Sequence, residues 1–325
     1  FFRDRRDDIF QQRTMVPDYV GLVEQPYGNV GSMVSFGADG NISYTQDFGR
    51  DFTLTLRGNF TYTANMVKTW EEAFQKYAYQ ERAGKPYNYY VGYIALGLFR
   101  DEDDVKYSPD QSSIAGREVL PGDIKYKDVN GDGVITSDDQ VPLSYQANYP
   151  RLMYGFGAEF RWKNLTLGVL FKGTGNVENY YVNPGNGGSG YLPFAMGVTG
   201  NVLSITTDQS NRWTPREISG TAATENPNAR FPRLSYGNDH NSLPQSTFWK
   251  TNARYLRLQE INLNYHLGAG NILKAVGVSS LDLQFVASNV YVWSPFKLWD
   301  PELASSNGGA YPIPARYAFQ MYINF

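Results

Sequence analysis

FTLTLRGNFTY, residues 52 to 62, alternates apolar and polar side chains almost throughout. Its apolar members are Phe52, Leu54, Leu56, Phe60 and Tyr62, and most of the residues between them are Thr, Arg or Asn. Successive side chains of a β-strand point to opposite faces of the sheet. The stretch therefore predicts a strand with one apolar face and one polar face.

The same alternation recurs along most of the chain. It is present in VSFGADGNISY (34–44), RLMYGFGAEFRW (151–162), LTLGVLF (165–171), YLRLQEINLNY (255–265), LDLQFVASNVYVW (281–293) and ARYAFQMYINF (315–325). These stretches are about as long as the roughly ten residues that a tilted strand needs to cross a bilayer. The strands of a β-sandwich also alternate, but they are usually about five or six residues long. The pattern favours a transmembrane barrel over a sandwich.

The connections between these strands are short at one end and long at the other. DFGRD (47–51), Lys163-Asn164 and the moderate stretch 266–280 make up the first set. The long connections cover roughly 70–149, 173–250 and 294–314. This asymmetry is typical of outer-membrane barrels, with periplasmic turns and extracellular loops. In a compact soluble domain, structureless loops of such length would be unusual.

A barrel of this kind makes the placement of individual side chains predictable. The residues expected to face lipid include Leu54, Leu56, Phe156, Phe160, Leu283, Phe285, Phe319 and Met321. Aromatic girdles at the membrane boundaries are expected from Tyr44, Tyr62, Trp162, Tyr265, Tyr291 and Trp293, although ordinary core aromatics would follow the same pattern. The last strand ends in Phe325, which resembles the terminal signal by which such barrels are assembled.

Composition excludes several other classes of protein. The net charge of −3 gives no reason to expect a nucleic-acid partner. The chain has no Cys and only two histidines, His240 and His266, which excludes thiolate chemistry and multi-histidine metal clusters. Carboxylate pairs such as Asp103/Asp104 or Asp138/Asp139 could suggest a glycosidase, but adjacent residues on a strand or turn point apart. We expect no enzymatic activity.

DVNGDGVITSDD, residues 128 to 139, has the spacing of a calcium loop. Asp128, Asn130 and Asp132 occupy loop positions one, three and five, Gly133 is at six, and Asp139 is at twelve. We expect one structural Ca²⁺, held by the side chains of Asp128, Asn130, Asp132 and Asp139 and by the carbonyl of Val134. A helical calcium sensor is disfavoured, because PGDIKYK reads as a turn and a short strand and Pro142 follows the loop. The alternative is a solvated acidic turn without a metal.

Taken together, these stretches resemble the C-terminal part of a SusC/RagA-type TonB-dependent transporter. The resemblance is carried by FFRDRRDDIF, YGNVGSMVSFGADGNISY, GDIKYKDVNGDGVITSDDQ, YPRLMYGFGAEFRWKNLTLGVLFKGTGN, ARYLRLQEINLNYHL, SLDLQFVASNVYVW, DPEL (300–303) and YPIPARYAFQMYINF. It implies that residues 1–325 form about eight strands of a larger plugged, all-β transmembrane barrel. The plug, the N-terminal strands and the TonB-contacting segment have no counterpart in these residues.

The resemblance also implies a function and partners. The expected activity is TonB-dependent import of oligosaccharides or peptides across the bacterial outer membrane, with a SusD-like surface lipoprotein over the extracellular mouth. The expected contacts are outer-membrane lipid, the rest of the barrel and the plug. The aromatic loops 77–93 and 179–194 are candidate contact surfaces. The alternatives are a passive porin or adhesin, or a calcium-stabilised secreted β-sandwich that binds or hydrolyses glycans.

Overall fold

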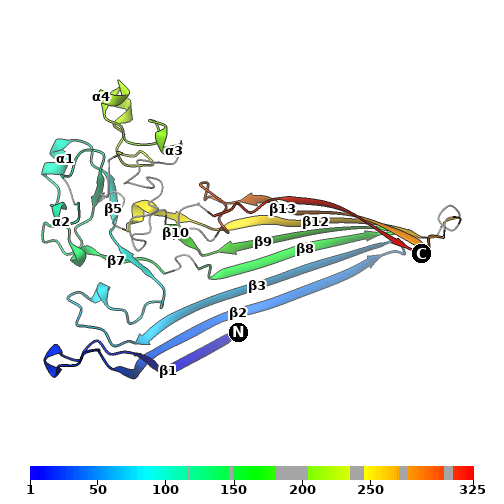
Figure 1. Cartoon of the computed structure of the whole chain (residues 1–325), viewed down its shortest axis with the longest axis horizontal. Helices are drawn as coiled ribbons and strands as arrows, with labels where there is room; N and C mark the ends of the chain where they lie inside the picture. The colour runs from blue at the N-terminus through cyan, green and yellow to red at the C-terminus, as the bar shows by residue number, and fades with distance from the viewer. Residues whose placement is uncertain are drawn as a thin grey trace.

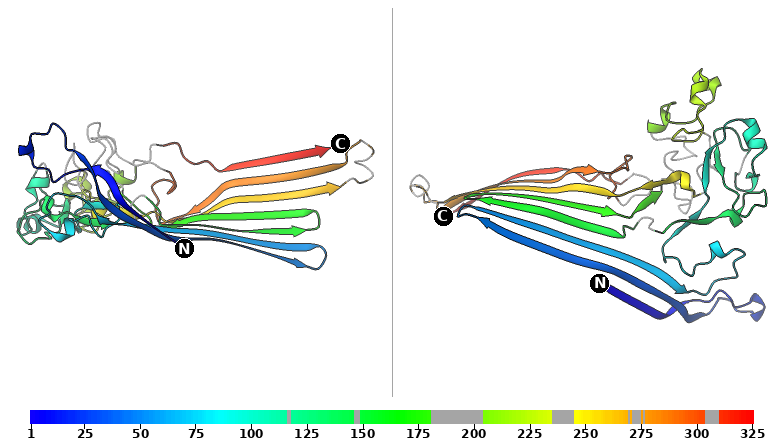
Figure 2. Two further views of the ribbon diagram at one scale, coloured as in Figure 1. Left: turned by 90° about the horizontal axis from the view of Figure 1, so that it is seen from below. Right: turned by 180° about the vertical axis from the view of Figure 1, so that it is seen from behind.

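The chain is built on a single curved antiparallel sheet, seen in a computed structural model that describes residues 1–115, 118–145, 149–180, 204–234, 245–268, 270, 275, 277–303 and 310–325. The sheet has eight strands in the order β1-β2-β3-β8-β9-β12-β13-β14, so each long strand pairs with the next long strand along the chain. Figure 1 shows these strands side by side, with a body of loops at one end and short turns at the other. The views in Figure 2 show the curvature of the sheet.

The eight long strands are β1 (Phe2–Gln12), β2 (Tyr27–Phe48), β3 (Phe52–Thr69), β8 (Leu152–Trp162), β9 (Leu165–Gly175), β12 (Tyr255–Gly268), β13 (Ser280–Trp293) and β14 (Arg316–Asn324). The predicted strand count and the short turns between β2 and β3 and between β8 and β9 are confirmed. Four strands are longer than the predicted ten or so residues: β2 has 22 residues, β3 has 18, and β12 and β13 have 14 each. β3 reaches the long connection that follows it, where Val67 exchanges backbone hydrogen bonds with Gly84 and Lys85.

The pairing register separates the sheet into an apolar face and a polar face. One transverse row crosses six strands with Leu54, Phe160, Leu167, Leu263, Phe285 and Phe319. The adjacent row consists of Thr53, Arg161, Thr166, Asn264, Gln284 and Gln320. We call the side of the first row the apolar face and the side of the second the polar face. The predicted alternation is therefore in phase across these six strands, as a wall between lipid and water requires.

The long connections fold into a compact loop body at one end of the sheet. It contains three two-stranded sheets: β4 (Tyr90–Gly92) with β7 (Val141–Ser144), β5 (Ala95–Leu98) with β6 (Ile124–Tyr126), and β10 (Glu178–Tyr180) with β11 (Lys250–Asn252). Its short helices are α1 (Glu102–Lys106), α2 (Ser112–Ala115), α3 (Ser204–Thr207) and α4 (Arg216–Ser219). Single 3-10 turns lie at Asp18–Val20, Ala78–Gln80, Ser137–Asp139, Ala222–Thr224 and Thr247–Trp249.

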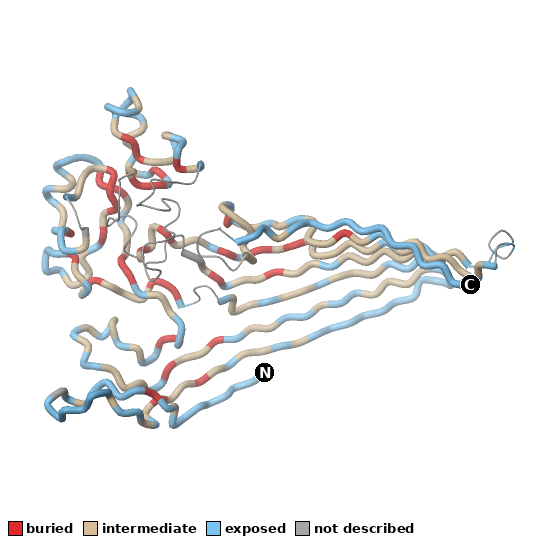
Figure 3. The backbone as a smooth tube through the Cα atoms, in the orientation of Figure 1, coloured by how far each residue is buried: buried red, intermediate tan, exposed pale blue. Residues whose placement is uncertain are grey.

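The loop body has a hydrophobic core of its own. Its buried members are Tyr93, Leu98, Ile124, Tyr126, Ile135, Trp213, Ala229, Phe231 and Trp249. Figure 3 shows that buried residues gather in this end of the molecule, whereas the long strands are mostly half-buried or exposed. The sheet has no comparable core, because its apolar face is uncovered. No helix in the described part of the chain is long and apolar enough to cross a membrane.

Candidate functional site

The acidic loop 128–139 lies between β6 and β7 in the loop body. The predicted short strand before it and the absence of a flanking helix are confirmed, since β6 ends at Tyr126 and β7 includes Pro142. Ile135, in the middle of the loop, is fully buried in the hydrophobic core. The loop is therefore anchored to the core through Ile135 while its acidic side chains turn outward or onto the loop backbone.

Asp128 organises the first half of the loop. Its carboxylate accepts the N–H groups of Gly131 at 2.7 Å and Gly133 at 2.8 Å. Both glycines have a positive φ, of 78° and 83°, which only glycine adopts without strain. The hydrogen bond from the Gly133 N–H, followed by that from Gly131, holds the pKa of Asp128 below its usual range.

Asn130 and Asp132 continue the turn. The Asn130 side-chain oxygen accepts the Asp132 N–H at 2.9 Å, and the Asp132 carboxylate accepts the Val134 N–H at 3.0 Å. The two side chains also bond to each other at 2.9 Å, from the Asn130 amide to the Asp132 carboxylate. The side chains of three predicted metal ligands, Asp128, Asn130 and Asp132, are thus turned toward the backbone of one compact turn.

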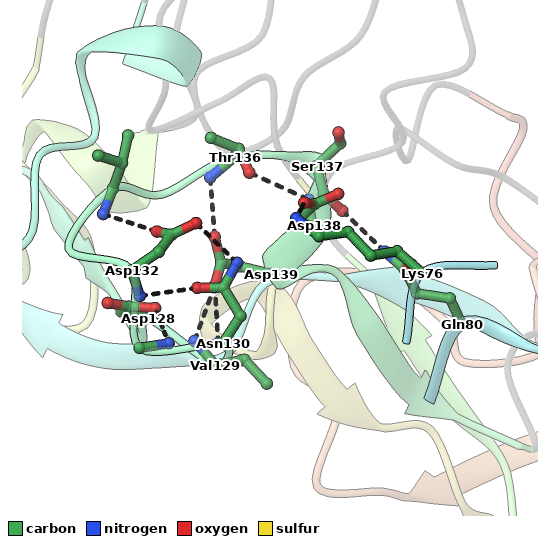
Figure 4. A network of polar contacts seen from close by, with 12 residues as sticks. Lys76, Gln80, Asp128, Val129, Asn130, Asp132, Thr136, Ser137, Asp138 and Asp139 are labelled. Atoms are coloured by element: carbon green, nitrogen blue, oxygen red, sulfur yellow. Dashed lines mark hydrogen bonds and ion pairs between the residues drawn. The ribbon is translucent and has the colours of Figure 1, made fainter. Parts of the chain in front are cut away.

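Asp139 closes the loop from its far end. It is fully buried, and its carboxylate accepts three backbone N–H groups, from Val129 at 2.8 Å, Asn130 at 3.4 Å and Thr136 at 2.8 Å. The Thr136 and Asp139 pair also forms a capping box around the turn Ser137–Asp139. Figure 4 shows this network, in which the Asp139 carboxylate contacts the backbone of Val129 and Asn130 near the start of the loop.

Residues 76–79 of the loop body contact the acidic loop from outside. Lys76 pairs with the Asp138 carboxylate at 2.7 Å, and the Tyr79 hydroxyl donates to the Asp138 carbonyl at 2.6 Å. Tyr93 is also buried in the core, whereas Tyr87 is exposed, so segment 77–93 has both packed and exposed aromatic side chains. Of the other predicted contact segment, 179–194, residues 181–194 lie outside the described part of the chain.

Whether this loop can bind calcium depends on how its oxygen atoms are arranged and which of them can still accept a ligand. Across the described ranges, no three Asp, Glu or His side chains are gathered as a set that could hold a metal ion. The loop carboxylates instead serve as acceptors for backbone N–H groups. Each ionised carboxylate has about four lone-pair positions, so these bonds leave further acceptor capacity on Asp128 and Asp132. Calcium binding by this loop stays a prediction.

A buried ionic cluster lies on the polar face, at the loop end of the sheet. Arg257 of β12 is 2% exposed, and its guanidinium contacts the two Asp300 carboxylate oxygens at 2.5 and 2.6 Å. Its Nε lies 3.1 Å from Glu302 without the angle of a hydrogen bond, and Lys172 of β9 contacts the other Glu302 oxygen at 2.6 Å. Two cations of the sheet thus hold two carboxylates of segment 294–303 against the wall.

Sequence reasoning missed this cluster as a site. DPEL was noted only as part of a family resemblance, and Arg257 only as one polar residue in an alternating strand. Arg257 and Asp300 are 43 residues apart, and segment 294–303 has no periodicity that would place it. A usable signal was present: a long basic side chain on a polar face predicts an acidic partner if the position becomes buried.

Comparisons with known proteins agree with this architecture. No family model matches the chain. TonB-dependent receptor P26 of Formosa agariphila is 27% identical over 255 residues, which cover 73% of this chain and 22% of the receptor. TonB-dependent receptor P39 of the same organism is 19% identical over 320 residues, covering 87% of this chain and 29% of the receptor. This chain therefore spans less than a third of either relative.

Solved structures give the same result for the fold. The RagAB peptide transporter superposes with a TM-score of 0.66 at 20% identity, covering 99% of this chain and 32% of that chain. The RagAB peptide importer in its closed-closed state gives a TM-score of 0.63 at 19% identity. The predicted resemblance to SusC/RagA-type TonB-dependent transporters and the all-β barrel fold are confirmed. The names of these proteins are those of receptors and transporters, and the expectation that the chain is not an enzyme agrees with those names.

Proposed function

We propose that this chain is the C-terminal part of the barrel of a TonB-dependent outer-membrane transporter that imports oligosaccharides or peptides. The observation that carries the proposal is the wall itself, in which apolar and polar rows stay in phase across six strands. A sheet with one uncovered apolar face needs an apolar environment, and the lipid around a transmembrane barrel supplies it. The plug, the remaining strands and the TonB-contacting segment belong to the rest of the longer protein.

The loop body supports an extracellular role for its end of the barrel. Short turns at the opposite end fit the periplasmic side. A folded loop body with its own core is a rigid platform, and we propose that a SusD-like lipoprotein docks on it. Exposed aromatic side chains such as Tyr87 and Tyr107, which are 43% and 78% exposed, suit contact with a lipoprotein, a sugar or a peptide.

The test is energy-dependent uptake by the complete transporter in cells. Labelled oligosaccharides and peptides are supplied to the strain, and uptake is compared with and without TonB and with the proton gradient dissipated. The proposal predicts that uptake is lost in both cases. Uptake that continues without TonB would instead indicate a porin, and surface binding without any uptake would indicate an adhesin.

We also propose that loop 128–139 binds one Ca²⁺ as a structural clip on the extracellular side. The spacing of Asp128, Asn130 and Asp132 supports this, as does the spare acceptor capacity of their oxygens. Extracellular calcium sites typically bind with a dissociation constant of roughly 0.1–1 mM. Calorimetry on the EDTA-treated complete transporter should show one such site, which Asp132→Ala removes.

The matched control for the calcium test is Asp103→Ala, which removes an acidic side chain of α1 outside the acidic loop. This variant should bind calcium like the unmodified protein. If millimolar calcium produces no heat of binding in the unmodified protein, the stretch is an acidic turn held by its own N–H bonds, and the calcium proposal is wrong.

A further inference from the structure

A groove on the apolar face has a lining that is partly basic. It is formed by Arg3 of β1, Val34 and Phe36 of β2, and Met66 and Lys68 of β3. Its volume is about 360 Å³, within the range of small-molecule sites. The register places Arg3, Val34, Phe36 and Met66 on one side, because Arg3 pairs with Phe36 and Val34 pairs with Met66, and the Lys68 ammonium reaches the Met66 sulfur. We call this the basic groove.

Within the part of the chain that the structure describes, the two cations of the basic groove have no anionic partner. Neither Arg3 nor Lys68 forms an ion pair within the described ranges, whereas neighbouring Arg5 and Arg6 pair with Asp7 and Asp4. The Lys68 ammonium has one polar contact there, the Met66 sulfur at 3.5 Å, and a thioether is a weak acceptor. Two unneutralised cations therefore flank three apolar side chains.

The height of the groove on the wall explains how cations are tolerated there. Tyr44 lies ten positions after Val34 in β2, which is about 34 Å along a strand that rises about 3.4 Å per residue. At a tilt of about 45° this corresponds to about 24 Å, close to the height of the apolar band of a barrel, about 25 Å. With Tyr44 in the periplasmic girdle, the basic groove lies at the extracellular boundary. A cation costs little there, and lipid headgroups lie at that level.

We propose that the basic groove binds a phosphate-bearing lipid of the outer leaflet. The phosphate lies between the Arg3 guanidinium and the Lys68 ammonium, and an acyl chain lies along Val34, Phe36 and Met66. Arginine and lysine are the usual phosphate partners, and the apolar part of the groove continues into the lipid-facing surface. This inference rests on the proposed outer-membrane placement, but not on the transported substrate.

The test uses the complete transporter in uncharged detergent, with bound lipid counted by native mass spectrometry. The probes are bisphosphorylated lipid A and the same lipid after removal of its phosphates. Each basic residue contributes about fivefold to binding of an anionic lipid, so Arg3→Gln with Lys68→Gln should weaken lipid A binding about 25-fold. The double variant should bind the two probes equally. Arg57→Gln with Arg161→Gln removes two cations from the polar face and should leave binding unchanged.

Heat-modifiable migration on a gel confirms that each variant is folded before its affinity is measured. The proposal is overturned if the groove variant binds lipid A as tightly as the unmodified protein, or if the polar-face variant loses as much affinity. It is also overturned if millimolar inorganic phosphate displaces the lipid, since the site would then be a free-anion site. Energy-dependent uptake measured on the same variants separates the two proposals, because normal uptake with no lipid binding contradicts only the groove.

Discussion

Replacing Arg257 by Ala should release segment 294–303 from the polar face. The side chain is 2% exposed and holds both Asp300 oxygens, so its removal leaves two carboxylates with Lys172 as their remaining cation. Breaking a buried ion pair on one side costs about 3–5 kcal/mol. Asp300 and Glu302 retain 16% and 31% side-chain exposure, which reduces the expected cost to about 2–4 kcal/mol.

Hydrogen–deuterium exchange of segment 294–303 measures this release directly. A cost of that size corresponds to about 30- to 700-fold faster exchange if the segment opens locally. The amide of Glu302 is a suitable reporter, because it donates to the Asp300 carboxylate at 2.9 Å. Arg257→Lys should give an intermediate rate, since one ammonium nitrogen cannot face Asp300 and Glu302 at once as the Nη2 and Nε atoms of the guanidinium do.

The matched control for this experiment is Arg161→Ala, which removes an exposed arginine from the same face of the sheet. It should leave exchange in segment 294–303 unchanged. If Arg257→Ala also leaves that exchange unchanged, the segment is held by the packing of Phe296 and Trp299, and the ionic cluster does not anchor it.

Three further outcomes are expected. Phe156→Arg, on the apolar face, should lower the free energy of unfolding in lipid by about 2–4 kcal/mol, and Glu159→Arg on the polar face should change it little; equal losses by urea unfolding would refute the assigned faces. Gly122→Ala should destabilise the loop body by about 1–3 kcal/mol, because the new methyl group would meet the Trp213 ring at 2.3 Å. Gly84→Ala, at a similar positive φ but in open space, should be less destabilising. The rate of proteolysis of the loops measures the difference between the two variants. Because the pKa of Asp128 is lowered in the folded state, its carboxylate stabilises the fold above about pH 4, and this effect is lost as the pH falls through the folded-state pKa. The midpoint temperature of thermal unfolding should therefore fall less between pH 6 and pH 3 for Asp128→Asn than for the unmodified protein.

The wall of the barrel could be predicted from local alternation, because side-chain direction in a strand follows from sequence position alone. Leu54, Phe160 and Phe285, assigned to the apolar face from separate stretches, fall on one transverse row. The aromatic residues assigned to girdles also lie on that face, and Tyr291 and Trp293 pack edge to face at 4.8 Å. Periodicity therefore predicted both the strands and their orientation.

The loop body could not be predicted in the same way. Its short strands have three or four residues each, too few for a period to be recognised. Its contacts join distant segments, as in the buried packing of Tyr93 and Ile135 with Trp249. The acidic loop was located by its spacing, but the use of Asp139 as an acceptor of three backbone N–H groups depends on the surrounding fold and not on the motif.

The core of the loop body also sets an order of events during biogenesis. The Ala95 N–H donates to the Thr247 hydroxyl at 2.8 Å across 152 residues of chain, and β8, β9 and part of the second long connection lie between them. Contacts between segments so far apart in the sequence form slowly, because closing a long loop costs conformational entropy until the intervening chain has folded. Pairing of β8 with β9 shortens that path. On the proposed outer-membrane placement, the loop body should therefore mature only after the β8–β9 hairpin has entered the membrane, and its apolar core should stay unassembled while the chain crosses the periplasm.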